Sequence, residues 1–161
     1  MEAVFFTQAL GRVTAYTMSF MYEAKLPFIV GATRQKDIEA LKAQGAEALK
    51  FTWDRSMWDA PFNHKLANGK RITAVYLITP EIPRATQVML DYIDYTFKKK
   101  GVKRFVIVTG THAKIGDGHI GKLWQRFIEL GAEYCVLRAT WFMGMSSSSA
   151  RRKNHRLIAP T

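Results

Sequence analysis

Residues 74–108, with the sequence AVYLITPEIPRATQVMLDYIDYTFKKKGVKRFVIV, contain the pattern that decides the fold. The apolar run 74–78 predicts a buried strand, because a short, continuous apolar run fits a strand that is covered on both faces. Pro83 then opens a helix whose apolar residues recur at helical spacing, and Gly101 ends it. A second apolar run follows at 104–108. The stretch therefore predicts a strand, a crossover helix and a parallel strand.

The same alternation continues in both directions from this unit. Apolar runs predict further strands at 3–7, 28–32, 48–51 and 134–137, and periodic stretches predict helices after Gly11 and at 36–44 and 118–130. This order predicts an α/β fold, a Rossmann-like, doubly wound parallel sheet of about six strands with helices on both faces. We expect one nucleotide-binding domain at 1–145, followed by a basic, disordered tail at 146–161.

Composition excludes several classes of protein. The net charge is +11, but the basic residues are scattered or gathered at a helix end and in the tail, which argues against a nucleic-acid partner. No apolar run of transmembrane length occurs, so we expect no membrane partner. The single cysteine, Cys135, cannot form an internal disulfide; it is expected to be buried and fits a reducing, cytoplasmic location. The histidines show no metal-ligand spacing, so no metal is expected.

In a parallel sheet, ligands bind beyond the carboxyl ends of the strands. The turn after the first predicted strand, 7–14, has Gln8, Gly11 and Thr14 where a dinucleotide-binding loop has three glycines. The free N–H groups of the next helix still suit a phosphate, although Gln8 and Thr14 are expected to crowd it and weaken binding. The predicted cofactor-binding residues here are Ala9, Leu10, Gly11, Arg12 and Val13. Taken alone, the motif fits an ordinary strand-to-helix turn better.

Basic residues follow the second predicted strand. Arg34 and Lys36 occupy the position that reads the adenosine ribose, where positive charge favours the extra phosphate of NADP over NAD. Solvated charges at a helix start would explain them equally well. Thr79 and Thr109 end two further strands and complete the predicted cofactor site. The sequence thus indicates NADP(H), weakly bound, if any nucleotide binds.

Catalytic residues are less clearly marked. The chain has no Tyr-x-x-x-Lys pair of the kind that standard short-chain dehydrogenases use. Lys122 and His119 are the catalytic candidates, as a carbonyl-polarising group and a proton carrier, although a surface or capping role fits the histidine better. Trp141 and Phe142 are the candidates for contact with substrate, with packing as the alternative.

Several segments together resemble the NmrA-like atypical short-chain dehydrogenases, and most closely the ergot-alkaloid reductases of the agroclavine and festuclavine dehydrogenase type; they are 74–80, 101–106, 131–138 and 140–143. The resemblance implies an NADPH-dependent reductase of an iminium-type intermediate in fungal alkaloid biosynthesis, with an alkaloid-type small molecule as substrate. The chain departs from that family at Gln8 and Thr14, at Ala139 where the family has proline, and after Met145. The expectation is a fold that lacks the family's C-terminal substrate-binding part.

Two alternatives remain open at this point. The altered glycine loop fits a non-redox isomerase or cyclase on the same scaffold. The chain also fits a non-catalytic NmrA-like regulator, or an inactive fragment, that binds a protein partner or forms a homo-oligomer because its sheet edge is exposed.

Overall fold

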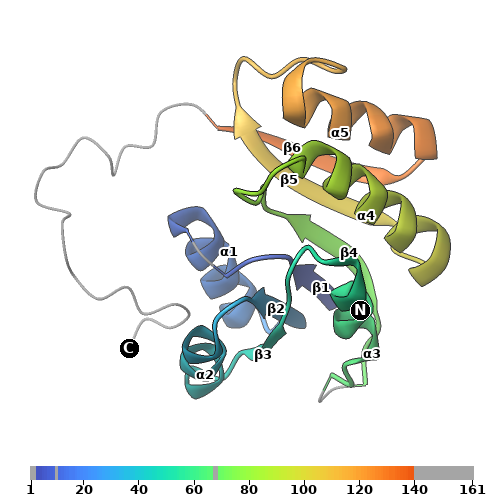
Figure 1. The fold of residues 1–161 in the computed structure, drawn as a ribbon. Coiled ribbons are helices and arrows are strands. Elements are labelled where there is room, and N and C mark those ends of the chain that lie inside the picture. Colours follow the sequence, from blue (N-terminus) through green and yellow to red (C-terminus); the bar gives the residue numbers. More distant parts are fainter. Residues whose placement is uncertain (1–2, 10, 67–68, 140–161) are drawn as a thin grey trace, which may run out of the picture.

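The computed structural model describes residues 3–9, 11–66 and 69–139, and within them six strands form one sheet with helices on both faces (Figure 1). The strands are β1 (Ala3–Phe6), β2 (Phe28–Ala32), β3 (Glu47–Lys50), β4 (Ile72–Leu77), β5 (Arg104–Gly110) and β6 (Glu133–Ala139). Every neighbouring pair is parallel, and the strand order is β3-β2-β1-β4-β5-β6. The predicted Rossmann-like parallel sheet is confirmed.

The strand order reverses direction between β1 and β4. From β1 the chain adds β2 and β3 on one side, then crosses to β4 and adds β5 and β6 on the other. A crevice forms where neighbouring connections leave the sheet in opposite directions, at the carboxyl ends of β1 and β4. The fold therefore places its ligand-binding position next to the turn that follows β1.

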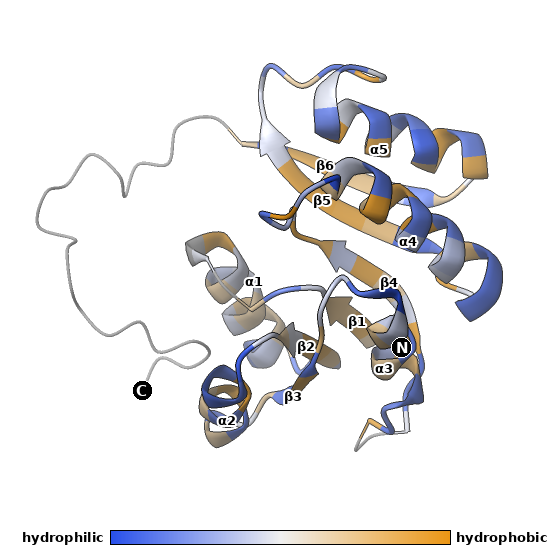
Figure 2. Ribbon diagram, in the orientation of Figure 1, coloured by the Kyte–Doolittle hydropathy of each residue, from blue (hydrophilic) through white to orange (hydrophobic). Residues whose placement is uncertain are grey.

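Each face of the sheet has its own apolar core. Phe5 belongs to one core and Phe6 to the other, because successive residues of a strand point to opposite faces. The two helices of the first half are α1 (Arg12–Glu23) and α2 (Gln35–Ala43). They supply Met18 and Leu41 to the core around Phe6. The helices α4 (Ala85–Lys100) and α5 (Gly118–Leu130) cover the opposite face. The strands carry much of the hydrophobic colour in Figure 2, whereas the helices alternate hydrophilic and hydrophobic segments.

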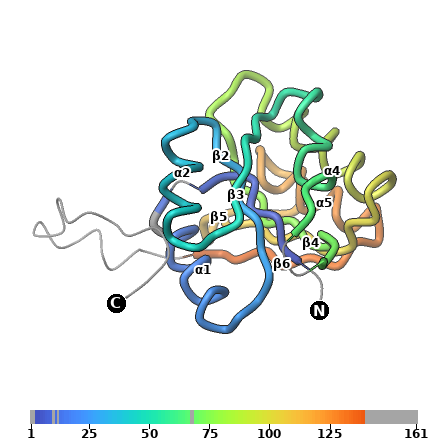
Figure 3. Tube along the Cα trace, turned by 90° about the horizontal axis from the view of Figure 1, so that it is seen from below, coloured from blue at the N-terminus to red at the C-terminus, as the bar shows by residue number. Residues whose placement is uncertain are grey.

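The connection from β3 to β4 contains two short elements that the sequence did not predict, the 3₁₀ helix η1 (Arg55–Met57) and the helix α3 (Ala60–Asn63). They place Trp58 in the core, where its ring meets Tyr92 edge to face at 5.4 Å. This connection leads from β3, in the first half of the sheet, to β4, in the second half. Figure 3 shows the fold from below.

The helix α4 begins two residues after Pro83, at Ala85, because Arg84 has a left-handed backbone (φ 57°). It ends as predicted at Gly101, also left-handed, with three lysines in its last turn. Positive charge there opposes the partial negative charge of the helix end.

The expectation that Cys135 is buried is wrong. Its strand, β6, is the outermost strand of the described sheet and has helix α5 on one face alone, so Cys135 is exposed and Leu137 keeps 45% of its surface. An apolar run cannot distinguish a central strand from an edge strand. The proposed tail at 146–161 lies outside the described residues. Among the described helices, none has the length and apolar character needed to span a membrane.

Candidate functional site

The turn after β1 is fastened to the end of β4. The hydroxyl of Thr7 accepts a hydrogen bond from the backbone N–H of Ile78 at 3.0 Å and donates one to the carbonyl of Tyr76 at 3.3 Å. The backbone N–H of Thr7 also donates to that carbonyl. Thr7 is buried, so these bonds hold the two strand ends together in a water-poor setting. The anchoring residue was within the turn that the sequence singled out, but its role was not predicted.

Gly11 gives this turn its shape. It caps α1 with φ 115°, a conformation that side chains with a Cβ rarely adopt. A Cβ placed on Gly11 would meet no atom within 4 Å, so the space above it is open. The first turn of α1 has no acidic residue, and its glycine cap has no side chain to cover the free N–H groups. Open backbone at the positive end of a helix is a favourable position for a phosphate.

The two residues that replace the outer glycines behave differently. Thr14 is buried where α1 packs on the sheet, so its hydroxyl does not stand in the open mouth of the turn. Any effect of Thr14 on a bound phosphate would act through the position of α1. Gln8 is half-buried in the turn itself. Of the other predicted binding residues, Ala9 is buried and Val13 half-buried.

Leu10 lies outside the described residues, and so does the side chain of Arg12, although Arg12 is the first residue of α1.

The two basic residues after β2 are exposed and differ in their contacts. Arg34 forms a double hydrogen bond with Asp37, from Nε to Oδ2 at 2.6 Å and from its terminal nitrogen to Oδ1 at 3.1 Å. The side chain of Lys36 has no partner within the described parts of the chain. Lys36 is therefore free to meet an anion, whereas Arg34 would have to share its guanidinium with Asp37. The pairing of Asp37 with Arg34 was not predicted, although a spacing of three residues on a helix signals such a pair.

Thr79 and Thr109 lie at the same edge of the sheet. The register pairs Leu77 with Ile107, so residues two positions further along both strands are neighbours. Thr79 is exposed and Thr109 half-buried. Since Thr79 follows the end of β4, it is next to the strand end that Thr7 holds. The ends of β4 and β5, close to Thr79 and Thr109, thus lie at the same edge of the sheet as the β1–α1 turn.

His119 links the two helices of the far half. Its Nδ1 lies 2.6 Å from the hydroxyl of Thr86, which places the first turn of α5 against the first turn of α4. Its other ring nitrogen, Nε2, is buried without a hydrogen-bond partner in the described structure. Burial lowers the pKa of His119, because the charged imidazolium loses hydration. At neutral pH the ring is uncharged and suits a structural contact or a weak proton carrier.

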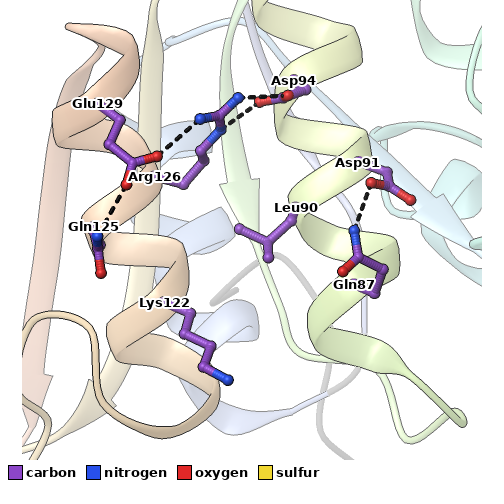
Figure 4. Close-up of a pocket in the computed structure, with 8 residues that line it drawn as sticks. All are labelled: Gln87, Leu90, Asp91, Asp94, Lys122, Gln125, Arg126 and Glu129. Carbon is purple, nitrogen blue, oxygen red and sulfur yellow. Dashed lines mark hydrogen bonds and ion pairs between the residues drawn. The ribbon is translucent and has the colours of Figure 1, made fainter.

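Lys122 belongs to helix α5 and not to the end of a strand. Figure 4 shows it in a groove of about 370 Å³ between α4 and α5, and all residues lining that groove come from these two helices. Arg126 crosses the groove, with Nε and a terminal nitrogen each 2.7 Å from the carboxylate of Asp94. No described residue of the β1–α1 turn lines the groove. The described residues of this groove thus include Lys122 but none of the predicted cofactor residues.

Trp141 and Phe142, the candidates for substrate contact, lie outside the described residues. In the described part, no group of three or more histidine, cysteine, aspartate or glutamate side chains could hold a metal ion.

Comparison with known proteins gives a consistent set of relatives. No family model matches the chain. It is 31% identical over 136 residues to festuclavine synthase I of Penicillium roqueforti, covering 83% of this chain and 45% of that protein. It is 28% identical over 144 residues to agroclavine dehydrogenase of Claviceps fusiformis, covering 87% and 47%. The resemblance to the ergot-alkaloid reductases is confirmed, and the chain spans about half the length of the curated relatives it matches.

Solved structures share the fold at lower identity. The triphenylmethane reductase of Citrobacter sp., crystallised with NADP(H), superposes with a TM-score of 0.64 at 13% identity, over 90% of this chain and 51% of that one. An NADPH-dependent quinone oxidoreductase of Escherichia coli, in complex with NADPH, gives a TM-score of 0.66 at 18% identity, over 87% and 49%. At these identities the match establishes the fold.

Proposed function

We propose that this chain binds NADP(H) at the carboxyl edge of the sheet and forms the nucleotide-binding part of a reductase. The observation that carries the proposal is the open, uncapped start of α1 over Gly11, at the point where the strand order reverses. The confirmed likeness to ergot-alkaloid reductases supports it, as does the fold shared with two reductases that were crystallised with NADP(H) or NADPH.

The residues of this edge fit the parts of the nucleotide. Backbone N–H groups at the start of α1 would bind the diphosphate. Lys36, with Arg34 when it is released from Asp37, would bind the phosphate on the adenosine ribose. Thr79 and Thr109 would line the path toward the nicotinamide. When bound, NADPH supplies a hydride, and the chain's task is to hold and orient it.

The proposed substrate is an iminium-type alkaloid intermediate, as the resemblance to the ergot-alkaloid reductases implies. Such a substrate is already cationic, so its reduction needs a positioned hydride more than a strong acid. The neutral state of His119, whose pKa burial lowers, is compatible with a reaction of this kind.

Calorimetric titration with NADPH tests the nucleotide site. We expect saturable binding at one site, and a loss of affinity of about tenfold or more in Gly11→Val, because valine cannot easily adopt φ 115° and fills the open space. Gly69→Val is the matched control, since Gly69 also has positive φ and open space but lies far along the chain. The proposal fails if no saturable binding occurs at millimolar NADPH in a folded protein.

Reduction is tested separately, by following NADPH absorbance with a cyclic iminium compound as substrate. Nucleotide binding without turnover would leave the site proposal standing and contradict the reductase proposal for this chain. Turnover of an alkaloid intermediate without nucleotide would favour the isomerase or cyclase alternative instead.

A further inference from the structure

A second hollow lies at the opposite edge of the sheet from the nucleotide site. It has a volume of about 630 Å³ and is formed by α3, the segment leading into β4, and the last residues of α4. Strand β4 begins at Ile72, and α4 ends at Lys100, so the hollow faces the amino ends of the strands. Nothing in the proposed reductase chemistry uses this edge.

The wall of the hollow is strongly basic. Its lysine and arginine residues are Lys65, Lys70, Arg71, Lys99 and Lys100, and none of the described residues that line it is an aspartate or glutamate. Lys65, Arg71 and Lys99 are exposed, and within the described structure their side chains have no hydrogen-bond or ion-pair partner. Cations that converge on a concave surface without compensation create a local positive potential that attracts anions.

Lys100 is held in a fixed position. Its ammonium group pairs with Asp59 and lies over the rings of Phe62 and Tyr95, at 5.9 and 5.5 Å from their centroids. The hydrogen bond to Asp59 raises the pKa of Lys100, so its charge persists at neutral pH. The same contacts orient Phe62, which also lines the hollow.

Apolar surface completes the site. Pro61, Leu66 and Ile72 line the hollow and are themselves buried, and Phe62 is half-buried beside them. The hollow thus combines an apolar floor with a rim of cations. This is the composition of a site for a small organic anion, and its volume lies in the usual range for such sites.

Stabilisation of the end of α4 does not by itself explain the basic residues of the hollow. Lysines at the end of α4 oppose the partial negative charge of the helix end, which explains Lys98 to Lys100. That effect falls off within the last turn and gives no reason for Lys65 or Arg71, which come from another segment.

We propose that this hollow binds a small phosphorylated molecule with at least two phosphate charges. Arg71 and Lys99 contact the phosphates, since a guanidinium can grip two phosphate oxygens at once. Phe62 packs against the carbon part of the ligand. A concave site suits a small molecule better than a nucleic acid, whose binding surface is an extended basic stripe.

Titration of the full chain with tripolyphosphate tests the proposal, with nuclear magnetic resonance of the histidine side chains as the readout. His64 lines the hollow, and His112 lies in the turn after β5 at the other edge. We expect saturable shifts at His64 and smaller ones at His112. Shifts at His112 alone would locate the anion at the carboxyl edge and overturn the proposal.

Two double variants distinguish binding in the hollow from a general attraction of anions by the net positive charge. Arg71→Gln with Lys99→Gln should weaken tripolyphosphate binding about tenfold or more. Lys25→Gln with Lys42→Gln removes the same charge from exposed positions outside the hollow, and Lys42, like Lys99, lies in the last turn of a helix. We expect less than about a twofold change in this control.

Equal weakening in both double variants would mean that tripolyphosphate responds to net charge alone, which contradicts a built site. Thermal denaturation of each variant shows that it is folded, so loss of binding is not loss of structure. An affinity for single-stranded oligonucleotides that grows with their length, without saturable tripolyphosphate binding, would also overturn the proposal in favour of a nucleic-acid surface.

Discussion

Arg34 occupies two roles that compete with each other. It is the residue before the first turn of α2, at the point where a ribose phosphate would lie, and its guanidinium is already bound to Asp37 through two hydrogen bonds. An exposed pair of this kind contributes little to stability, but it must be rearranged before a phosphate can take the same donors. In the proposed site, specificity for NADP(H) would therefore depend on Asp37 as well as on the two basic residues.

Removing the carboxylate of Asp37, which competes for Arg34, should raise the affinity of the site for NADPH. We expect Asp37→Asn to strengthen NADPH binding several-fold, because Arg34 no longer has a carboxylate partner, and to leave NADH binding nearly unchanged.

Lys36→Ala should weaken NADPH binding about tenfold, equivalent to about 1.4 kcal/mol, again without an effect on NADH. Competitive titrations with both nucleotides give the ratio, and Lys42→Ala on the same helix is the control. A parallel loss of NADPH and NADH affinity would assign Lys36 to the diphosphate.

His119 makes folding stability depend on pH. Burial lowers its pKa in the folded chain below the unfolded value of about 6.5, so the unfolded chain binds the proton more readily. The contribution of His119 is fully present above pH 6.5 and is lost as pH falls through that value toward the lowered folded pKa. We expect His119→Gln to flatten the fall in melting temperature between about pH 7 and 5. If the melting temperature of His119→Gln falls with pH as steeply as that of the unaltered chain, His119 is excluded as the cause of the pH dependence. His112→Gln is the control.

At the level of the element, α5 packs unusually closely against the turn that precedes it. A Cβ on Gly121 would lie 2.0 Å from the carbonyl oxygen of Lys114, and that turn is fixed by a 2.8 Å hydrogen bond from the N–H of Gly116 to the carbonyl of Gly121. The obstructing atom belongs to the backbone, so a small side-chain rotation cannot make room. The position of the Thr109 end of β5 depends on the same turn.

Gly121→Ala should therefore destabilise the chain, although alanine normally stabilises a helix interior by about 1 kcal/mol over glycine. We expect a loss of about 1–3 kcal/mol in the free energy of unfolding, measured by denaturant titration, as the turn is displaced. Gly110→Ala is a useful comparison, because there a Cβ would meet the ring of His112, a side chain that can move. A stabilised Gly121→Ala variant would show that the turn shifts at no cost.

Local signals predicted the elements that have clear ends. The helix Gly118–Leu130 and the strand Phe28–Ala32 agree with the prediction at both ends, the helix because Gly131 supplies the left-handed residue that stops it. The helix Ala60–Asn63 was missed because four residues carry too little periodicity. The exposure of Cys135 was missed because edge position is a property of the whole sheet.

In the candidate site too, some features have a local sequence signal and others do not. The turn at Gly11 and the threonines at strand ends could be placed from sequence, because the carboxyl ends of parallel strands share one edge. The direction of Lys122 could not, because the rotation of α5 is set by which of its faces packs against α4 and the sheet. The contact between His119 and Thr86 joins residues 33 positions apart and has no local signal.

Over the whole molecule, the positive charge is larger than its ion pairs can offset. The chain has 24 lysine and arginine residues against 13 aspartate and glutamate residues, and the ion pairs of the described part, such as Arg104 with Glu133, lie mostly at the surface. Surface pairs contribute little, whereas an excess of one charge opposes the compact state through self-repulsion. The same excess draws anions toward both edges of the sheet.

Screening should therefore stabilise this protein. We expect the melting temperature to rise by a few degrees as sodium chloride increases to about 0.2 M at neutral pH, where the screening length is near 7 Å. Lys25→Glu with Lys42→Glu lowers the net charge from +11 to +7, since each change removes one positive and adds one negative charge. This variant should show a smaller rise, measured by circular dichroism under the same conditions. A melting temperature that falls with salt would mean that the ion pairs, including Arg126 with Asp94, outweigh the repulsion of the excess charge.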